Sequence, residues 1–458
     1  MKQRNRIFLS LVSVGLIVAI FPPFDFWFLA PIAWLPFLAA LNNATPRQAF
    51  YLGLLHGILT FAGTLTWMWI IFSSATISLW AILGIFTALF GLFVAKRKTF
   101  SPFIIAILWT GIEYYRCELF YLSFPWITPG TGFPPNWFTP LIGVYGVSFL
   151  IILANGFLLG ERRRAVLGIS TLAALFIATA SFSKISVSAS DIPVTLIQIE
   201  TPNPDTYLYA TQDLPKSNGP IVWPEYAYGI YPSPFKKDHD ALIALLKNDN
   251  RILVTGGKVP IDQEEGIWEN SAFTFGPADL LGVHVKNHPV HLFNDGEKGQ
   301  HAKAIDTPYG RIGTPICFDC DFQDVIRKMT KDGAEYFLIP SMDAKKWTAR
   351  QHEQHGQLFR HRAAENGRSL AVCSSSGVTQ IIDPHGHVRD RLPTMTEEVL
   401  TGHVTPQSHR TVFQLAGWLF GPTTLIITIG AILVTLRPKG ANQLSPAAER
   451  ETSVALGP

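Results

Sequence analysis

The sequence has little charge and few cysteines. Only 16% of its 458 residues are charged, and its mean hydropathy is +0.22, whereas a soluble protein carries about 25% charged residues. The net charge of +3 is too small to indicate a nucleic-acid partner. Four cysteines in a chain of this length exclude a disulfide framework, and no second C-x-x-C or Cys/His pair completes a zinc site. Phosphate-cradling glycine loops are also absent. We therefore expect neither a metal nor a cofactor.

The shortage of charge is concentrated in two parts of the chain. Residues 1–182 are nearly all apolar runs, residues 190–405 have the composition of a soluble domain, and an apolar run returns at 411–436. Crossing the hydrocarbon layer takes roughly 20 mostly apolar residues. Eight such spans are predicted, near 7–22, 26–42, 49–71, 75–95, 101–120, 138–160, 164–182 and 411–436. The first span is kept as a helix and not taken for a signal peptide, because no small-residue cleavage site follows it.

These spans predict a polytopic α-helical membrane protein with four regions. Residues 1–182 would form an N-terminal membrane domain of seven helices, and 183–410 an extramembrane domain. Residues 411–436 would form a C-terminal transmembrane helix, and 437–458 a cytoplasmic, disordered tail.

Basic residues flank the eight predicted spans on one side of the membrane only. They are Lys2, Arg4, Arg6, Arg47, Lys96, Arg97, Lys98, the run ERRR at 161–164, Arg437 and Lys439. The opposite loops carry no lysine or arginine until the large domain begins. By the positive-inside rule both termini are cytoplasmic and residues 183–410 lie outside the cytoplasmic membrane. The alternative, that these charges simply end helices, does not explain why they fall on one side.

The extramembrane region alternates between strand-like and helix-like segments. Helices are expected at 236–248, 321–332 and 350–366, and β-rich segments at 192–200, 219–224, 251–257, 271–276, 310–318, 334–341, 369–376 and 379–386. Most of these strands are bounded by glycine or proline. This alternation indicates a layered α/β domain.

Three residues in or just past predicted strands could carry chemistry: Glu225 in IVWPEYA, Lys286 in GVHVKNH and Cys317 in GRIGTPICFDCDF. A cysteine at a strand-to-helix turn exposes its sulfur, and the helix N-terminus is expected to lower its pKa. A carboxylate can take the thiol proton, and a lysine can stabilise a developing oxyanion. Taken singly, such a glutamate or lysine is usually a solvated surface residue and such a cysteine an inert core residue. Together they suffice for acyl transfer through a thioester.

The order of these motifs resembles the nitrilase superfamily, with its Glu–Lys–Cys triad and αββα sandwich. WENSAFTFGP (268–277) and HRAAENGRSLAVCSSSGVTQIIDPHGHV (361–388) extend the likeness. FPW (124–126) and TPLIGVYGVSFLIILANG (139–156) resemble the apolipoprotein N-acyltransferase family, whose members combine this domain with eight membrane helices. The resemblance implies a location in the bacterial inner membrane with the catalytic domain outside the cytoplasm, and a monomer is expected.

The resemblance also implies roles for individual residues. Glu225 would be the general base, Lys286 the transition-state stabiliser and Cys317 the nucleophile. Cys317 would take an acyl chain from a phospholipid and pass it to the diacylglyceryl-cysteine of an apolipoprotein. Trp126 would line the lateral access route. Two alternatives stay open: a membrane-tethered amidase or acyltransferase with another acceptor, and a catalytically silent membrane scaffold.

The sequence departs from the family pattern at positions that bear on substrate binding. Phe318 and Asp319 stand where the family has Tyr-Glu after the nucleophile. The functional glutamate expected eight residues after the lysine is replaced by Asn294, and Glu297 fills that place only with an insertion of three.

Two further groups of residues are expected to be structural. His352, His355 and His361 share a predicted helix, and their spacing does not match a zinc-protease motif, so a solvated helix face is expected. Cys320 is expected to be a packing residue, although a bridge between Cys317 and Cys320 is left open.

Overall fold

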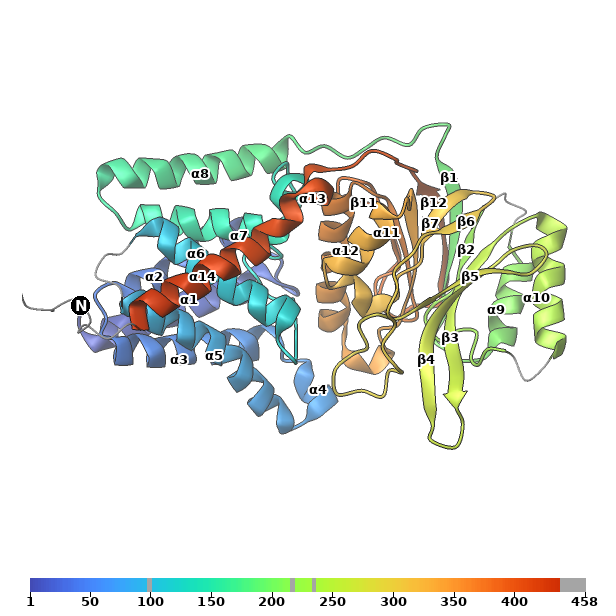
Figure 1. The fold of residues 1–458 in the computed structure, drawn as a ribbon, viewed down its shortest axis with the longest axis horizontal. Coiled ribbons are helices and arrows are strands. Elements are labelled where there is room, and N and C mark those ends of the chain that lie inside the picture. The colour runs from blue at the N-terminus through green and yellow to red at the C-terminus, as the bar shows by residue number, and fades with distance from the viewer. Residues whose placement is uncertain (97–100, 215–218, 233–235, 437–458) are drawn as a thin grey trace, which may run out of the picture.

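The computed structural model describes residues 1–96, 101–214, 219–232 and 236–436. A bundle of helices lies at one end of the long axis and a layered α/β part at the other (Figure 1). The predicted tail at 437–458, with Arg437 and Lys439, lies outside the described residues, as do Arg97 and Lys98.

The bundle is built from residues 3–180 together with the C-terminal helices. Its elements are α1 (Gln3–Ile20), η1 (Trp27–Ile32), α2 (Leu35–Leu41), α3 (Pro46–Thr64), α4 (Met68–Phe72), α5 (Ala75–Ala95), α6 (Pro102–Tyr114), η2 (Tyr115–Leu119), α7 (Thr139–Leu158), α8 (Arg162–Ala180), α13 (Val412–Leu415), η5 (Gly417–Leu419) and α14 (Phe420–Leu436). Figure 1 shows the N-terminus and the turn between α7 and α8 at the end of the bundle farthest from the sheets.

Five helical segments in the described part of the chain are long and apolar enough to cross a membrane. They are Gln3–Ile20, Ala75–Ala95, Thr139–Leu158, Arg162–Ala180 and Gly417–Leu436. Each coincides with one of the eight spans that the sequence predicts. The protein therefore has several helices consistent with a membrane protein, and the count of eight stays a prediction.

The other three predicted spans are interrupted in the structure. Residues 26–42 are divided between the 3₁₀-helix η1, which contains Pro31, and the seven-residue helix α2, which has Pro36 in its first turn. Proline removes a backbone donor and clashes with the preceding turn, so it begins a helix more readily than it continues one. Residues 49–71 are shared between α3 and α4, and α6 ends in the π-helical turn η2 after 13 residues.

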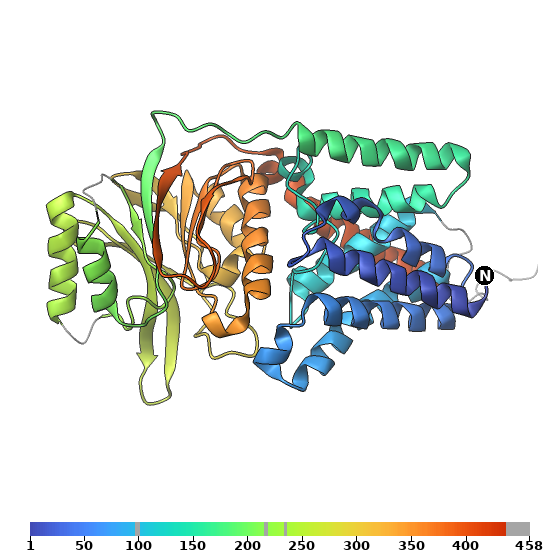
Figure 2. The same cartoon turned by 180° about the vertical axis from the view of Figure 1, so that it is seen from behind.

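The outermost helices expose apolar surface. Only 17% of the apolar window of α8 is buried inside the protein, and the same share is buried in the segment Gly417–Leu436, which contains α14. Ile169 and Ile177 on α8, and Ile426 and Leu433 on α14, are all exposed. Both views place α8 along the edge of the bundle (Figures 1 and 2). Apolar helices with so little protein contact need a lipid environment to cover them.

The α/β part consists of two six-stranded sheets. The first has the order β12-β1-β2-β3-β4-β5 and the second β11-β10-β9-β8-β7-β6. The strands are β1 (Ile192–Gln198), β2 (Ile221–Val222), β3 (Leu253–Asp262), β4 (Ile267–Phe275), β5 (Leu280–Val285), β6 (Ile305–Thr307), β7 (Gly310–Gly313), β8 (Tyr336–Ser341), β9 (Leu370–Ser374), β10 (Gln380–Ile382), β11 (Val388–Arg391) and β12 (Glu398–Val404).

Helices cover the outer face of each sheet. Strands β1, β2 and β3 are parallel, as are β7, β8 and β9, and parallel neighbours require a crossover connection. The crossovers are α9 (Pro204–Gln212), α10 (Lys236–Asp249), α11 (Asp324–Lys331) and α12 (Ala349–Asn366). The predicted α/β layering is confirmed as an αββα sandwich.

Side-chain alternation along β8 fills two cores at once. Leu338 packs between the two sheets, whereas Phe337 and Ile339 pack against the helices on the other face. Successive side chains of a strand point to opposite faces, so a strand buried on both sides reads as the continuous apolar run YFLIPS.

Helix α12 joins the sandwich to the bundle. The Trp67 indole donates to Gln354 Oε1 at 2.9 Å, and Glu365 Oε1 accepts from the Val144 amide at 2.8 Å. The Arg350 guanidinium donates to the Pro22 carbonyl at 2.8 Å. These polar contacts fix the bundle against the face of the sandwich that carries the second sheet.

Candidate active site

Glu225, Lys286 and Cys317 line one cavity although they come from both sheets. Glu225 follows β2 and Lys286 follows β5 in the first sheet, while Cys317 follows β7 in the second. All three side chains are buried. The cavity has a volume of about 650 Å³, and it lies where the two sheets and the bundle meet.

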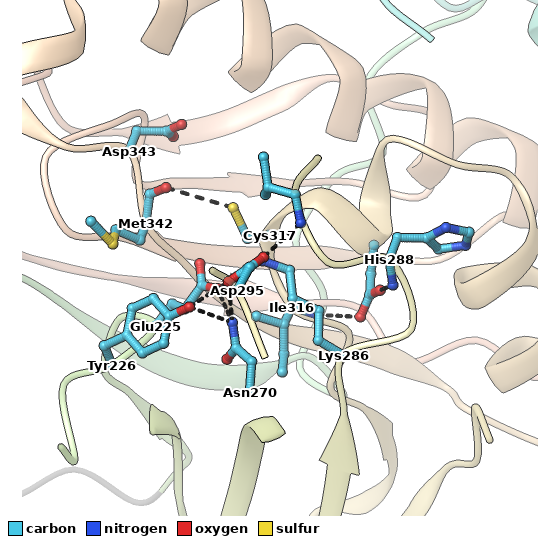
Figure 3. Close-up of polar contacts among 12 residues, drawn as sticks. Glu225, Tyr226, Asn270, Lys286, His288, Asp295, Ile316, Cys317, Met342 and Asp343 are labelled. Atoms are coloured by element: carbon cyan, nitrogen blue, oxygen red, sulfur yellow. Dashed lines mark hydrogen bonds and ion pairs between the residues drawn. The ribbon is translucent and has the colours of Figure 1, made fainter. Parts of the chain in front are cut away.

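Lys286 is held between two carboxylates (Figure 3). Its Nζ donates to Glu225 Oε1 at 2.9 Å and to Asp295 Oδ2 at 2.7 Å. The Asn270 amide donates to the same Glu225 oxygen at 2.7 Å and to Asp295 Oδ1 at 2.9 Å. The Tyr226 hydroxyl also donates to Asp295. Lys286 is thereby fixed, with both carboxylates hydrogen-bonded.

This arrangement leaves Glu225 as the group that can accept a proton. Burial, and then the charge of Asp295, raise the pKa of Glu225 above its ordinary value of 4.5, although Lys286 opposes the shift. Burial alone would lower the pKa of Lys286, but Glu225 and Asp295 together raise it well above 10.5. Burial would raise the pKa of Asp295, but the charge of Lys286 outweighs it and lowers the pKa.

Cys317 begins a short 3₁₀-helix, η3 (Cys317–Cys320), in a strained backbone conformation. Its φ is 46°, in the left-handed region that side chains other than glycine rarely adopt. Its thiol donates to the Met342 carbonyl oxygen at 3.6 Å. Observed strain of this kind is frequent at reactive positions, where the surrounding structure holds a side chain in place.

The expectation that a helix N-terminus lowers the pKa of Cys317 is wrong. Burial and the nearby Glu225 carboxylate raise the pKa of this thiol well above 9.0. The helix that starts at Cys317 has only four residues, and α11 begins at Asp324. Cys317 therefore rests as a thiol, and it needs a base to become a nucleophile.

Three of the five predicted supporting residues line the cavity. They are Trp126, Asn294 and Phe318. Trp126 is buried, and its indole donates to Asp321 Oδ2 at 2.6 Å. Glu297 is exposed and its backbone pairs with Glu269, away from the described lining.

Asp319 is a structural acceptor, buried out of contact with the cavity. Its Oδ1 accepts from the amides of Asn287 and His288, each at 2.8 Å. Its Oδ2 accepts from the Ile316 amide at 3.1 Å and from His284 Nε2 at 2.9 Å. Asp319 thus fastens the segment that follows Lys286 to the turn that carries Cys317.

Asp295 is not among the site residues that the sequence predicts. The two positions considered for the acidic residue after Lys286 were Asn294 and Glu297, and the structure instead places the Asp295 carboxylate on the Lys286 ammonium. One chemical argument points to Asp295. A buried lysine beside one carboxylate is stabilised by a second carboxylate, and Asp295 directly follows Asn294, the position expected for the acidic residue.

The prediction that His352, His355 and His361 face solvent is wrong, because α12 is covered on both sides and all three are buried. His355 Nδ1 lies 2.9 Å from Asp343 Oδ1, and its Nε2 lies 3.3 Å from Asp321 Oδ1. Burial would lower the pKa of His355, but the two carboxylates raise it to about 10.

The resulting cluster surrounds the turn that carries Cys317. Asp343 follows Met342, whose carbonyl accepts the thiol, and Asp321 directly follows η3. The Trp126 ring stacks on His355 with centroids 5.7 Å apart. The loop that carries Trp126 therefore contacts Asp321 directly and Asp343 through His355.

The bundle supplies an apolar wall to the cavity. The lining side chains from α4, α5 and the loop after η2 are Met68, Ile71, Phe72, Leu79, Ile82, Leu83, Leu122 and Phe124. One side of the cavity therefore suits a hydrocarbon chain, and the other holds Glu225, Lys286 and Cys317.

All four cysteines are buried free thiols. Cys320 packs with Val325, Ile326 and Met329 in the core beneath the second sheet, as expected. Within the described residues, no three His, Cys, Asp or Glu side chains are grouped to hold a metal ion.

Two family models match the chain. The model described as the apolipoprotein N-acyltransferase N-terminal domain matches residues 13–157, and the model described as carbon-nitrogen hydrolase matches residues 220–413.

Curated relatives match along most of their length. The apolipoprotein N-acyltransferase of Geobacter metallireducens is 28% identical over 87% of this chain and 89% of its own. That of Haemophilus influenzae is 25% identical over 96% of this chain and 97% of its own. A solved carbon-nitrogen hydrolase from Helicobacter pylori is 20% identical over 53% of this chain and 98% of its own, with a TM-score of 0.41.

Proposed function

Because the chain belongs to the apolipoprotein N-acyltransferase family of the nitrilase superfamily, we propose that it acylates apolipoproteins through a thioester on Cys317. Its class of activity, lipoprotein N-acylation, follows from the family. The donor proposed is a phospholipid, and the acceptor is the α-amino group of a diacylglyceryl-cysteine. The observation that supports this most directly is the cavity itself, in which an apolar wall faces Glu225, Lys286 and Cys317.

In the first step Cys317 attacks an ester carbonyl of the phospholipid. Glu225 takes the thiol proton as the sulfur–carbon bond forms, and the raised pKa of Glu225 makes it a suitable base. The ester C–O bond then breaks, and Glu225 returns the proton to the glycerol oxygen. A lysophospholipid leaves, and the acyl chain remains on Cys317 as a thioester.

In the second step the amine of the acceptor attacks the thioester. Glu225 takes a proton from the attacking nitrogen, the carbon–sulfur bond breaks, and the proton passes to the departing Cys317 sulfur. The amide product and the free thiol result, so the same base serves both steps.

Lys286 is proposed to stabilise the oxyanion of both tetrahedral intermediates. It lies between Glu225 and Asp295, and a preorganised cation in a buried site needs little rearrangement as negative charge develops. Asp295 is proposed to orient Lys286 and to keep Glu225 basic.

The membrane arrangement proposed has both termini in the cytoplasm and residues 183–410 outside it. The regions proposed remain 1–182, 183–410, 411–436 and 437–458. Apolar exposed helices such as α8 and α14 support a location within the membrane. A single chain supplies Glu225, Lys286 and Cys317, which favours a monomer.

Three cavity residues are proposed to contact the lipid. Trp126 and Phe318 present aromatic surface to an acyl chain near Cys317, and Asn294 lies at the rim. Asp319 does not line the cavity and is proposed to support the site by joining the segment after Lys286 to the turn that carries Cys317.

The deciding experiment follows the acyl chain. Purified protein mixed with phosphatidylethanolamine is expected to gain the mass of one acyl chain on Cys317, detected by mass spectrometry and released by hydroxylamine. Cys317→Ala is expected to abolish the adduct, and Cys320→Ala, which removes a nearby thiol in the core, is expected to keep it. If wild-type protein acquires no acyl adduct from any phospholipid, the proposed donor is wrong.

A further inference from the structure

Lys258 is a cation at the rim of the cavity that the two proposed steps do not use. It lies in β3, its residue is exposed, and its side chain contributes to the cavity lining. Its Nζ stands 4.3 Å from the centre of the Trp268 ring and 5.5 Å from that of the Tyr226 ring. Aromatic faces attract an ammonium group without neutralising its charge. The two rings therefore hold Lys258 in place and leave its charge available.

The other lysine that lines the cavity is already paired. Lys286 donates to Glu225 and Asp295, so its charge is balanced within the site. Lys258, in contrast, forms no ion pair with any residue that the structure describes. No other lysine or arginine is among the described lining residues. An anionic group in this cavity would therefore find its partner at Lys258.

The remaining carboxylates of the lining have partners of their own. Glu200 accepts from the Ser376 hydroxyl and from the Lys345 amide, and Asp343 is paired with His355. Lys258 is thus not the counter-ion of an acidic residue in the wall.

The sheet places Lys258 beside the catalytic groups. Lys258 in β3 is directly opposite Asn270 in β4, and side chains opposite each other in an antiparallel pair lie on the same face of the sheet. Asn270 in turn donates to Glu225. The residue opposite Lys258 is therefore a hydrogen-bond partner of Glu225, and Lys258 and Glu225 line the same cavity.

We propose that Lys258 binds the phosphodiester of the donor phospholipid during thioester formation. This inference rests on the proposed function, because it needs the acyl ester of a phospholipid at Cys317. With the hydrocarbon chain against the wall from α4 and α5, the glycerol and its phosphodiester extend toward the polar rim. The lysophospholipid that leaves carries the phosphodiester with it, and a diacylglyceryl-cysteine has none. Lys258 thus selects the donor and acts in the first step alone.

The experiment compares two donors in the purified full-length protein. One is phosphatidylglycerol, and the other is 4-nitrophenyl palmitate, an acyl ester without phosphate. Lys258→Met keeps an unbranched side chain of similar length and removes the charge, and Lys258→Arg keeps the charge. Lys247→Ala on α10 is a control for a lysine remote from the cavity. The single-turnover rate of acyl-enzyme formation is measured for each variant, and the rate of amide formation is measured with pre-acylated enzyme.

The expected result is a loss confined to the phospholipid. Lys258→Met is expected to slow acylation by phosphatidylglycerol about tenfold, the effect of one charge-assisted hydrogen bond. Acylation by 4-nitrophenyl palmitate and the second step are expected to be unchanged, and Lys258→Arg is expected to restore most of the rate.

Other outcomes would overturn the inference. Equal slowing with both donors would mean that Lys258 supports the site without contacting phosphate. Slowing of the second step alone would place Lys258 on the acceptor. If Lys258→Met reacts with phosphatidylglycerol at the wild-type rate, and wild-type protein forms its thioester, the phosphate contact is refuted and the proposed function is not. A wild-type protein that reacts with 4-nitrophenyl palmitate but with no phospholipid would refute the proposed donor and this contact together.

Discussion

At the scale of single residues, the site contains one ammonium group between two carboxylates. A lysine with one carboxylate partner would hold that partner in its ionised form. The second carboxylate, Asp295, takes part of the charge of Lys286 and leaves Glu225 more basic than an isolated Lys–Glu pair would allow. Cys317 rests as a thiol. In the proposed mechanism, the strength of Glu225 as a base therefore decides how readily this thiol becomes a nucleophile.

This balance predicts the pH dependence of thioester formation. Glu225 must be ionised to act, so the rate should fall as the pH drops through a pKa above 4.5. Asp295→Asn removes a negative charge near Glu225, which lowers the pKa of Glu225 and weakens the base. We therefore expect the acid limb of the pH–rate profile to move to lower pH and the plateau rate to fall by about 10²-fold, the size of a general-base contribution.

The measurement is the single-turnover rate of acylation between pH 4 and 9. Glu297→Gln, an exposed acidic position outside the described cavity lining, is the matched control and should keep the wild-type profile. An acid limb that does not move in Asp295→Asn would show that Asp295 does not set the pKa of Glu225.

The sequence singles out Glu225, Lys286 and Cys317 by their order and by the strand that precedes each, and the structure brings all three to one cavity, while their catalytic roles stay predictions. Asp295 could not be aligned, because it lies in a loop between β5 and β6 whose length the motif does not fix. The ionisation of Cys317 was also beyond the sequence, since it depends on burial and on Glu225, which is 92 positions away.

At the scale of elements, helix α12 connects three parts of the protein. It covers the second sheet, it contacts the bundle through Arg350, Gln354 and Glu365, and it carries His355. An imidazolium between Asp321 and Asp343 joins the end of η3 to the segment after β8. Buried groups of this kind cost much when one partner is removed, because the others remain charged without compensation.

Stability should therefore depend on pH through His355. Its pKa is raised from 6.5 to about 10 in the folded protein, so folding takes up a proton between these values. The stabilisation is complete below pH 6.5 and is lost as the pH rises through 10. His355→Gln is expected to lower the free energy of unfolding by about 3–5 kcal/mol at pH 7 and to remove this pH-dependent component.

Thermal unfolding in detergent at pH 6, 8 and 10 measures this effect. His403→Gln, which changes an exposed histidine, is the control and should retain the wild-type pH dependence. The difference between wild type and His355→Gln should shrink as the pH rises, and a constant difference would contradict the assignment of a charged His355.

Eight of the twelve strands and three of the four crossover helices of the sandwich were predictable, because glycine or proline boundaries and side-chain alternation are local signals. The predicted segments do not include the helix α9 or the strands β5, β6, β11 and β12. The membrane segments were less predictable than the sandwich. Residues 26–42 are apolar enough for a span, but Pro31 and Pro36 divide them, and composition alone does not register that break. The burial of His352, His355 and His361 follows from packing against both the sheet and the bundle, which a single helix does not reveal.

At the scale of the whole molecule, two of the basic segments that suggest the topology lie far from the sandwich. The N-terminus is at the distal end of the bundle, and so is the turn between α7 and α8, where the run ERRR begins α8 (Figure 1). A membrane around the bundle would separate this end from the sandwich, as the positive-inside rule requires for a catalytic domain outside the cytoplasm.

Cysteine labelling can test this orientation, because the four native thiols are buried and should react little. Gln263→Cys places an exposed thiol in the hairpin between β3 and β4, and Glu161→Cys places one before α8. In spheroplasts, a membrane-impermeant maleimide should label Gln263→Cys directly and Glu161→Cys only after permeabilisation. Labelling of Glu161→Cys alone in sealed spheroplasts would reverse the proposed topology.

The cavity is lined by both the bundle and the sandwich, so neither part contains the whole cavity by itself. A soluble fragment spanning residues 183–410 would keep Glu225, Lys286 and Cys317, yet it would lose the wall formed by α4 and α5. The face of α12 that now meets the bundle would be open to water, with Gln354 and Glu365 deprived of Trp67 and Val144. Truncation would therefore yield a fragment that keeps the residues proposed for the chemistry and lacks the apolar wall proposed to hold the acyl chain. Inhibitor screens on this protein therefore need the intact chain.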